Sequence, residues 1–284
     1  RAVVLRHGKL AGDVLLPVPQ DRLVEMMFGQ AMAPQERISA VKADAPAALA
    51  FEALTVRDHR LVVRDLNLTI RTGEVLGLAG LDGSGQSLIM RAAAGLMRPE
   101  HGRVKLDGAD LTGRPYRQFL AAGVSFGAAG RLEEGLIPGL TLTEHFALVS
   151  ERGTMVDWAR ARRLAEEQIA HYQIKGRAES NIETLSGGNQ QRVLLAMLPE
   201  TPRLLVLEQP TRGLDVESAQ WVWEQLLARR DHGAAILFSS DDLDELLGYS
   251  NRILVCFAGR TTLLENTPEM NVSRLGMLIG GGQG

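Results

Sequence analysis

Two glycine-rich turns are the parts of this chain best suited to chemistry on phosphate groups. The first precedes an expected helix over residues 88–94 and reads Gly80, Leu81, Asp82, Gly83, Ser84, Gly85, Gln86 and Ser87. The second opens a helix that continues through residues 193–197 and reads Leu185, Ser186, Gly187, Gly188, Asn189, Gln190, Gln191 and Arg192. Small residues let the backbone approach an anion, and a helix N-terminus offers free N–H groups and a positive dipole end. A generic flexible turn is the alternative for the bare Ser-Gly-Gly pattern.

The first turn fits the phosphate-loop pattern at every defining position except one. It follows an expected strand that ends at Ala79, and it carries both glycines and the closing Ser87. Gln86 stands where the pattern has lysine. The backbone cradle is kept and Ser87 can still bind Mg²⁺, but a glutamine brings no charge to the β- and γ-phosphates. We therefore expect weak nucleotide binding at this loop.

Bulk composition is that of an ordinary globular protein. The chain has 284 residues, 45% hydrophobic and 23% charged residues, and a formal net charge of −3. This mild acidity gives no broad electrostatic reason to bind nucleic acid. The single Cys256 excludes a disulfide framework and suits the cytosol. No apolar run approaches the roughly 20 residues of a membrane helix.

The first residues indicate a piece of a longer polypeptide. The sequence starts at Arg1 with a pattern typical of the middle of a strand, without an initiator Met or a signal peptide. A constant offset of 251 residues relates this segment to the C-terminal one, and the matching pairs are Arg1 and Arg252, Val4 and Val255, Gly8 and Gly259, Pro17 and Pro268, Met26 and Met277, Gly29 and Gly280. Both segments read as strand, glycine turn, strand, proline and amphipathic helix. We interpret residues 1–30 as the tail of a preceding domain, with chance similarity as the alternative, and residues 31–48 as a linker.

Apolar runs alternate with helical patterns along residues 49–284. From Leu54 the chain is strand-rich, and the runs that read as strands are 61–63, 66–70, 75–79, 123–126, 204–207, 234–238 and 253–257. Helical patterns occupy residues 88–94, 157–172 and 220–230. This alternation predicts an α/β sheet with ligands at the carboxyl ends of its strands. The helical block at about 140–200 is predicted to be an inserted subdomain.

These motifs together resemble ATP-binding cassette (ABC) ATPases. The resemblance covers residues 50–284 and rests on the Asn-Gln-Gln form of the signature loop at 185–192, on Gly83 to Gln86, and on Gln209-Pro210-Thr211-Arg212-Gly213-Leu214-Asp215. It points to the C-terminal cassette of tandem ATPases that energise bacterial simple-sugar and nucleoside importers, and Gln86 favours the nucleoside branch. The implied fold is a P-loop NTPase-like cassette with a mixed sheet core, an N-terminal antiparallel β part and an inserted helical signature subdomain.

The resemblance also implies roles for residues that depart from the family pattern. Glu208 stands in for the aspartate that holds Mg²⁺ through water. Gln209 replaces the general base, and its amide cannot accept a proton at neutral pH. Asp241 replaces a histidine that contacts the γ-phosphate, and Ala129 aligns with a Gln or Glu that senses Mg²⁺. His59 is either an adenine-stacking residue or, more simply, a surface histidine.

In the resembled family two cassettes face each other head to tail. Leu185, Ser186, Gly187, Gly188, Asn189 and Gln190 would then complete a site whose phosphate loop lies in a preceding N-terminal cassette. Gly213, Leu214 and Asp215 would form the loop at that interface. This chain's own site would bind ATP and Mg²⁺ weakly. Membrane permease subunits would dock near residues 135–148, and a solute-binding protein would act indirectly.

Three hypotheses for function follow. The first is an ABC importer ATPase subunit at the cytoplasmic face of the inner membrane, which donates its signature loop and hydrolyses little ATP itself. The second is a non-catalytic pseudo-ATPase that regulates or scaffolds a membrane complex. The third, a cassette protein acting on DNA or ribosomes, is disfavoured by the acidic charge balance and by a linker without a basic run.

Overall fold

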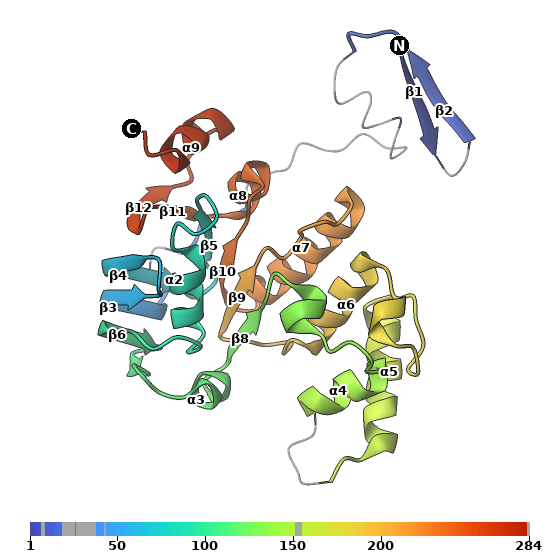
Figure 1. The fold of residues 1–284 in the computed structure, drawn as a ribbon, viewed down its shortest axis with the longest axis horizontal. Coiled ribbons are helices and arrows are strands. Elements are labelled where there is room, and N and C mark those ends of the chain that lie inside the picture. Colours follow the sequence, from blue (N-terminus) through green and yellow to red (C-terminus); the bar gives the residue numbers. More distant parts are fainter. Residues whose placement is uncertain (7–8, 19–25, 27–37, 43, 151–154, 283–284) are drawn as a thin grey trace. The chain divides into compact units, whose positions relative to one another are not determined.

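The computed structural model describes residues 1–6, 9–18, 26, 38–42, 44–150 and 155–282 (Figure 1). The chain divides into two compact units, residues 1–37 and 38–284. In the first unit β1 (Ala2–Arg6) and β2 (Lys9–Val14) form an antiparallel hairpin. The helix expected after Pro17 lies almost wholly outside the described residues, as do residues 31–37 and 43 of the expected linker.

A six-stranded mixed sheet is the centre of the second unit. In spatial order its strands are β12 (Arg260–Glu265), β11 (Arg252–Phe257), β5 (Val75–Ala79), β10 (Ala235–Ser239), β9 (Leu204–Glu208) and β8 (Val124–Gly127). All neighbours pair in parallel except β12, which runs antiparallel to β11 at the edge. Every residue of β5 and β10 is buried, as expected for strands covered on both faces. The predicted α/β sheet is confirmed.

A second, antiparallel sheet is formed by two strands that precede the phosphate loop in sequence and two that follow it. Its strands in spatial order are β4 (Val62–Arg71), β3 (Ala47–Arg57), β6 (His101–Leu106) and β7 (Ala109–Asp110). β3 begins at Ala47, inside the segment 31–48 that the sequence assigned to a linker. Alanine-rich stretches have low strand propensity, but Leu49 is buried and pairs with both Ile70 and Leu106, so packing decides.

Helices cover both faces of the mixed sheet, and their bounds are α2 (Gln86–Ala93), α3 (Tyr116–Ala121), α4 (Leu142–Ser150), α5 (Trp158–His171), α6 (Gly187–Met197), α7 (Val216–Asp231), α8 (Leu243–Tyr249) and α9 (Val272–Ile279). Alternate residues of β5 point to opposite cores. Leu76 and Leu78 pack in the core that holds α2 and the antiparallel sheet, whereas Val75 and Ala79 pack in the core formed with α4 to α9.

The predicted helical insert is confirmed as α4, α5 and α6, which gather beside the mixed sheet (Figure 1). α5 falls within the helical pattern predicted over residues 157–172, and its Ala161 and Ala165 are buried. Thr141 forms a single bridge with Asn181 and so joins the start of α4 to the segment before α6.

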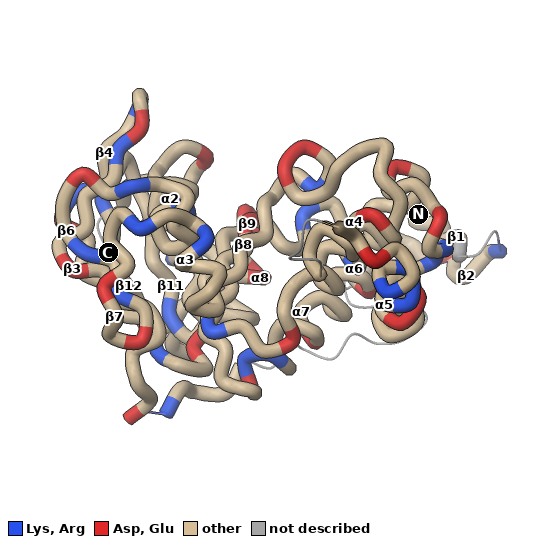
Figure 2. The backbone as a smooth tube through the Cα atoms, turned by 90° about the horizontal axis from the view of Figure 1, so that it is seen from below, with Lys and Arg blue, Asp and Glu red and all other residues tan. Residues whose placement is uncertain are grey.

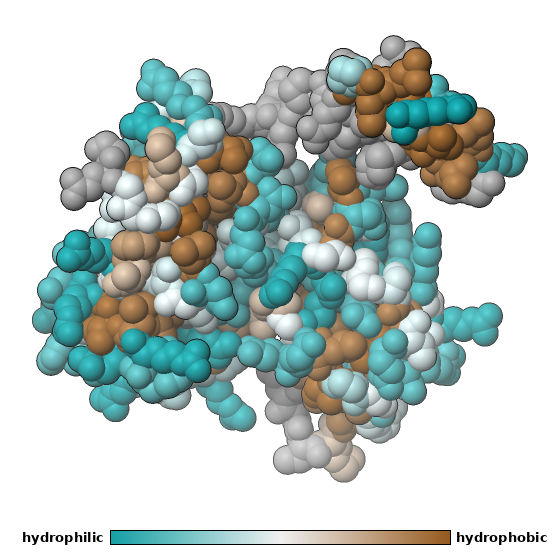
Figure 3. Space-filling view, turned by 45° about the horizontal axis from the view of Figure 1, so that its top comes forward, coloured by the Kyte–Doolittle hydropathy of each residue, from teal (hydrophilic) through white to brown (hydrophobic). Residues whose placement is uncertain are grey.

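Charged residues of both signs are interspersed along the described chain (Figure 2). The face drawn in Figure 3 carries apolar patches among polar surface residues. None of the helices in the described ranges combines the length and apolar character that crossing a bilayer requires.

Candidate nucleotide site

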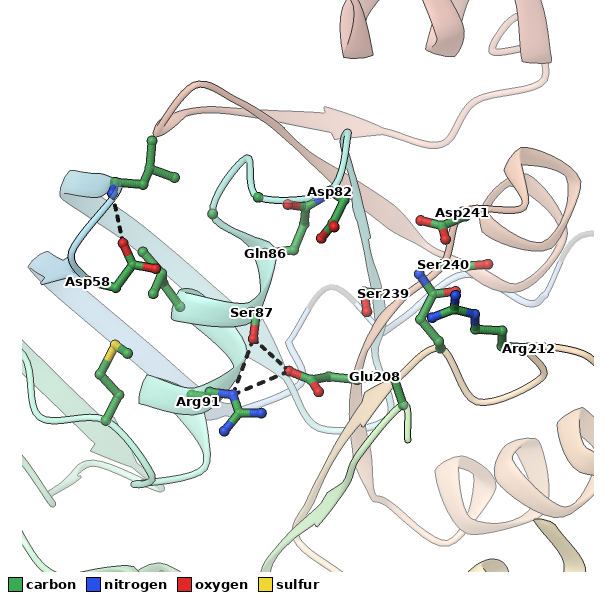
Figure 4. Close-up of a pocket in the computed structure, with 17 residues that line it drawn as sticks. Asp58, Asp82, Gln86, Ser87, Arg91, Glu208, Arg212, Ser239, Ser240 and Asp241 are labelled. Carbon is green, nitrogen blue, oxygen red and sulfur yellow. Dashed lines mark hydrogen bonds and ion pairs between the residues drawn. The ribbon is translucent and has the colours of Figure 1, made fainter. Parts of the chain in front are cut away.

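Loops that follow four neighbouring parallel strands converge on one cavity of about 380 Å³ (Figure 4). They follow β5, β10, β9 and β8, whose carboxyl ends meet at one edge of the sheet. The residues that line this cavity are Asp58, Leu61, Asp82, Gly83, Gly85, Gln86, Ser87, Leu88, Arg91, Met97, Ala129, Glu208, Gln209, Arg212, Ser239, Ser240 and Asp241. The structure thus brings together most of the residues predicted for the chain's own nucleotide site, whereas Gly80 and Ser84 of the same loop do not line the cavity. His59 is exposed in the loop that carries Asp58 and Leu61.

The phosphate loop keeps a backbone that only glycine allows at two points. Gly80 has φ of 156°, and an added Cβ would lie 2.5 Å from the carbonyl oxygen of Cys256. Gly85 has φ of 121°, and its Cβ would lie 2.8 Å from Cγ2 of Val63. Gly85 is also the N-cap of α2, with no side chain to cap the helix. The first N–H groups of α2 are therefore left for an anion.

Gln86 turns its polar end back onto its own loop. Its Nε2 donates a hydrogen bond to the carbonyl oxygen of Leu81 at 3.3 Å. Figure 4 draws the amide beside Asp82. An uncharged side chain that bonds to its own loop supplies no electrostatic attraction to a polyphosphate.

Ser87 and Glu208, the predicted Mg²⁺ ligands, are brought into direct contact. The Ser87 hydroxyl donates a hydrogen bond to Glu208 Oε1 at 2.9 Å, so the longer glutamate side chain does reach it. Arg91 lies beside them, with Nε at 3.2 Å from Ser87 Oγ and 3.8 Å from Glu208 Oε1. This pair fits a divalent ion poorly, because each group already has the other as partner and a guanidinium adjoins both.

Arg91 is a site residue that the sequence analysis missed. It lies four residues after Ser87 on α2, a spacing that places two side chains on the same helix face. That spacing was the available signal. The phosphate-loop pattern ends at Ser87 and makes no prediction for the next turn of the helix.

Gln209 and Asp241 lie in the cavity where the resemblance placed a general base and a switch histidine. Gln209 is held in the left-handed region, with φ of 49°, and its backbone N–H donates to the carbonyl oxygen of Ser239 at 3.0 Å. Asp241 is exposed at the rim, after β10. Ala129 also lines the cavity, but its methyl group can neither coordinate a metal nor donate a hydrogen bond to a phosphate.

Carboxylates outnumber cationic side chains around the cavity. The acidic members are Asp58, Asp82, Glu208 and Asp241, and the basic ones are Arg91 and Arg212. Hydrogen bonds from the backbone N–H groups of Arg60 and Leu61 lower the pKa of Asp58 and favour its charged form. A polyphosphate in this cavity therefore meets net repulsion from the side chains and attraction chiefly from the backbone.

The signature loop stands apart from this cavity and is braced from within its own subdomain. Ser186 is the N-cap of α6 and is exposed. Asn189 donates to Ser186 Oγ at 2.8 Å and accepts from the backbone N–H of Lys175 at 2.7 Å. Gln190 is buried and donates to the carbonyl oxygen of Leu185 at 3.1 Å. Asn189 and Gln190 thus shape the loop, while Ser186 and the following N–H groups remain available to an anion.

Arg131 connects the signature loop with the predicted interface loop. It begins a π-helical turn, Arg131–Gly135, and its Nη1 donates to the carbonyl oxygen of Arg212 at 2.8 Å. A Cβ added at Gly187 would lie 3.2 Å from Arg131 Nη2, and one added at Gly213 would lie 3.7 Å from it. A positive charge therefore lies beside the glycines of both loops, a feature that the sequence analysis also missed.

Asp215 has a structural task in this conformation. It is the N-cap of α7 and accepts a hydrogen bond from the backbone N–H of Ser218 at 2.9 Å. This bond, with a second from the Ser218 hydroxyl, lowers the pKa of the Asp215 carboxyl. Leu214 closes the turn before it through a backbone bond to Thr211.

The parallel strands, the glycine loop at a helix N-terminus and the helical insert define a P-loop nucleotide-binding cassette. The family model described as "ABC transporter" matches residues 63–212. The chain belongs to the ABC transporter family, whose ATPases bind ATP with Mg²⁺.

Curated relatives match nearly the whole chain. It is 32% identical to the nucleoside import ATP-binding protein NupA of Lactococcus lactis, over 99% of this chain and 58% of the relative. It is 33% identical to the guanosine import ATP-binding protein NupO of Bacillus subtilis, over 99% and 57%. Identity to the ribose import ATP-binding protein RbsA 1 of Rubrobacter xylanophilus is 35%, over 92% and 53%. The chain therefore spans about half the length of these relatives.

Solved structures share the fold. An ATP-binding subunit of an ABC transporter superposes with a TM-score of 0.67 at 23% identity, over 82% of this chain and 99% of the other. A dimeric ATP-binding cassette in a post-hydrolysis state, bound to ADP and Pi, gives a TM-score of 0.65 at 22% identity, over 77% and 99%. The predicted fold class is confirmed: an α/β cassette with a mixed sheet, an antiparallel N-terminal sheet and a helical insert.

Proposed function

We propose that this chain is the second cassette of a tandem ABC importer ATPase for nucleosides or simple sugars. It donates its signature loop to a nucleotide site whose phosphate loop belongs to the preceding cassette. Its own site binds ATP weakly and hydrolyses little. The observation that carries this proposal is the contrast between two loops: the signature loop is braced by Asn189 and its Ser186 is exposed, whereas Gln86 is neutral and bonded to its own loop.

The low activity of the chain's own site follows from the side chains around the cavity. Gln209 cannot take a proton from an attacking water at neutral pH, and Gln86 brings no charge to the phosphates. Asp241 adds repulsion at the position of the switch histidine. These losses act on one reaction step, and we expect the isolated chain to turn over ATP more slowly than about 0.1 per second, below the usual enzymatic range.

Two observations support a preceding cassette. The relatives named above are about twice as long as this chain. The hairpins β1–β2 and β11–β12 are separated by the same offset of 251 residues that relates their sequences. On this basis residues 1–30 are the end of the first cassette, and the second occupies most of the remainder, from β3 onward.

The names of the relatives supply the class of cargo. NupA and NupO are nucleoside and guanosine import proteins, and RbsA 1 is a ribose import protein. We infer permease subunits as partners, docked near residues 135–148 at the cytoplasmic face of the inner membrane. Ile137 and Leu148 are exposed there, as an apolar contact would require. A solute-binding protein acts only through the permease.

The donor role is tested by Ser186→Arg in the full tandem polypeptide assembled with its permease. The arginine side chain obstructs the turn, and loss of oriented donors typically lowers turnover by about 100-fold or more. We expect solute uptake and ATP hydrolysis to fall together. Ser273→Arg on the exposed face of α9 is the matched control, because it makes the same change away from both loops. Unchanged uptake in the Ser186→Arg variant refutes the donor role.

A regulatory pseudo-ATPase is the second candidate, favoured by the same substitutions at Gln86, Gln209 and Asp241. The tandem protein separates the two functions. A donor cassette makes hydrolysis depend on Ser186, whereas a scaffold leaves the hydrolytic rate unchanged when Ser186 is replaced and loses only assembly or regulation when its surfaces are altered.

A further inference from the structure

We propose that the guanidinium of Arg91 serves as the resident cation of the chain's own nucleotide site, so that ATP binds there without a divalent metal. This inference rests on the proposed weak ATP binding at that site, and it identifies the cation that neutralises the phosphates there. It concerns a residue outside the phosphate-loop motif.

Arg91 is fixed by contacts on several sides. Its Nε lies 3.2 Å from Ser87 Oγ and 3.8 Å from Glu208 Oε1, and its Nη2 forms an ion pair with Glu134 Oε2 at 2.8 Å. The guanidinium carbon lies 5.9 Å from the ring centre of Phe126, within cation–π range. Two carboxylates, a hydroxyl and a ring therefore hold this side chain at the cavity wall.

Arg91 lies directly beside the position that a divalent ion would need. A P-loop metal is held by the Ser or Thr hydroxyl that ends the loop and by the carboxylate at the end of the neighbouring strand. Here those groups are Ser87 and Glu208, which bond each other, and the guanidinium touches both (Figure 4). The Glu208 side chain is only 11% exposed. A metal ion entering there would have to displace Arg91 or accept a like charge at contact distance.

Arg91 also faces the space where phosphates would lie. It lines the cavity together with Gln86 and Ser87, from the second turn of the helix whose N-terminus forms the anion cradle. Arg91 Nη1 has no hydrogen-bond partner among the described residues. A guanidinium presents donors in a planar fork that matches phosphate oxygens and stays charged at any physiological pH. With Gln86 neutral, Arg91 is the cation that α2 offers to the nucleotide.

The experiment is an ATP titration of the purified chain by calorimetry, in excess MgCl₂ and in excess EDTA. We expect the two dissociation constants to differ by less than about threefold, equivalent to under about 0.7 kcal/mol. Arg91→Gln should weaken binding in EDTA by about tenfold, the loss of one charge-assisted contact. It should also create a requirement for Mg²⁺, because Glu208 and Ser87 are then free of the guanidinium. Arg98→Gln is the control, because Arg98 is exposed after α2 and this substitution removes the same charge.

Glu208→Gln gives a result of opposite sign under the two models. If Arg91 is the cation, removing the competing carboxylate tightens ATP binding in EDTA by about threefold or more. If Glu208 holds a metal, the same variant weakens binding in MgCl₂. Thermal melting of each variant confirms that it folds.

Three outcomes overturn the inference. If ATP binding to the wild type tightens by more than about tenfold on adding Mg²⁺, a divalent metal takes part in binding at this site. Arg91→Gln with unchanged affinity in EDTA removes Arg91 from the nucleotide contact. Absence of ATP binding in both solutions excludes the inference and the weak own site together, while the donor role of Ser186, tested separately in the tandem protein, is unaffected.

Discussion

Glu245 is the best place to test how the loops around the cavity are held. Its carboxylate is buried on α8 and accepts hydrogen bonds from Thr211 Oγ1 at 2.5 Å, from Trp223 Nε1 at 2.6 Å, and from the Ser240 hydroxyl. Thr211 follows β9 and Ser240 follows β10, so one side chain joins the two segments that carry Gln209 and Asp241. Glu245→Ala removes all three bonds, whereas Glu245→Gln keeps the shape of the side chain.

The size of the effect follows from burial. An unsatisfied buried donor costs about 1–3 kcal/mol. Trp223 and Ser240 are buried and cannot turn to water, whereas Thr211 is half-buried and can. Removing a buried carboxyl gives back part of its desolvation. We therefore expect Glu245→Ala to lower the free energy of unfolding by about 3 kcal/mol, which corresponds to a fall in Tm of about 6–12 °C for a unit of this size.

Scanning calorimetry of the chain provides the measurement. Glu245→Gln should cost less than about 1 kcal/mol, because its amide oxygen can accept from Trp223 and its NH₂ can donate to Ser240. Glu269→Ala, at an exposed position, is the control. A loss below about 1 kcal/mol for Glu245→Ala, or equal losses for the alanine and glutamine variants, would refute the role assigned to these bonds.

The pH dependence of stability tests the same side chain, Glu245, in a second way. Burial raises the pKa of Glu245 above its ordinary value of 4.5, although its hydrogen bonds oppose the shift. The folded state then holds the proton to a higher pH than the unfolded state does. The stabilisation from this group is full below the unfolded pKa and is lost as pH rises through the folded pKa. Relative to Glu245→Gln, the wild type should therefore lose stability as pH rises from about 4.5.

Two further predictions concern single side chains. His145 is fully buried, with Nε2 accepting from the backbone N–H of Ile137 at 3.0 Å and Nδ1 at 2.8 Å from the carbonyl oxygen of Thr141. His145→Ala should lower the free energy of unfolding by about 2–4 kcal/mol in urea titrations, and a loss under 1 kcal/mol would contradict this. Gln86→Lys, freed from the carbonyl of Leu81, should tighten ATP binding about tenfold by calorimetry without raising hydrolysis, and increased hydrolysis would be the contrary result.

Sequence patterns predicted the mixed sheet well because its central strands are buried on both faces. β9, β10 and β11 appear as uninterrupted apolar runs, and such runs between helical patterns leave few arrangements besides a parallel sheet. The start of β3 was not predicted. Ala47 and Ala48 have no strand signal of their own, and only the pairing partners on β4 and β6 make them part of a sheet.

The candidate site was predictable only where a motif fixes the backbone. The glycines of the phosphate loop place Gln86 and Ser87 at the cavity whatever surrounds them. The spacing from Ser87 places Arg91 on the same helix face but does not reveal its role. The roles of Arg91 and Arg131 depend on Glu208 and on the carbonyl oxygen of Arg212, which are 117 and 81 positions away along the chain. Contacts of this kind are set by how strands and helices pack, and spacing in one sequence carries no record of them.

The difference between the two anion-binding loops of this chain is one of charge and not of backbone. Both have glycines that admit close approach, and both open a helix whose first N–H groups are uncapped by a side chain. Around the first, carboxylates at four positions outnumber Arg91 and Arg212, and the neutral Gln86 adds no charge to balance them. Beside the second, Arg131 adds a positive charge. A change at one position can therefore alter how tightly the first loop binds, but hydrolysis requires a base at Gln209 as well, so affinity and turnover must be regained by different substitutions.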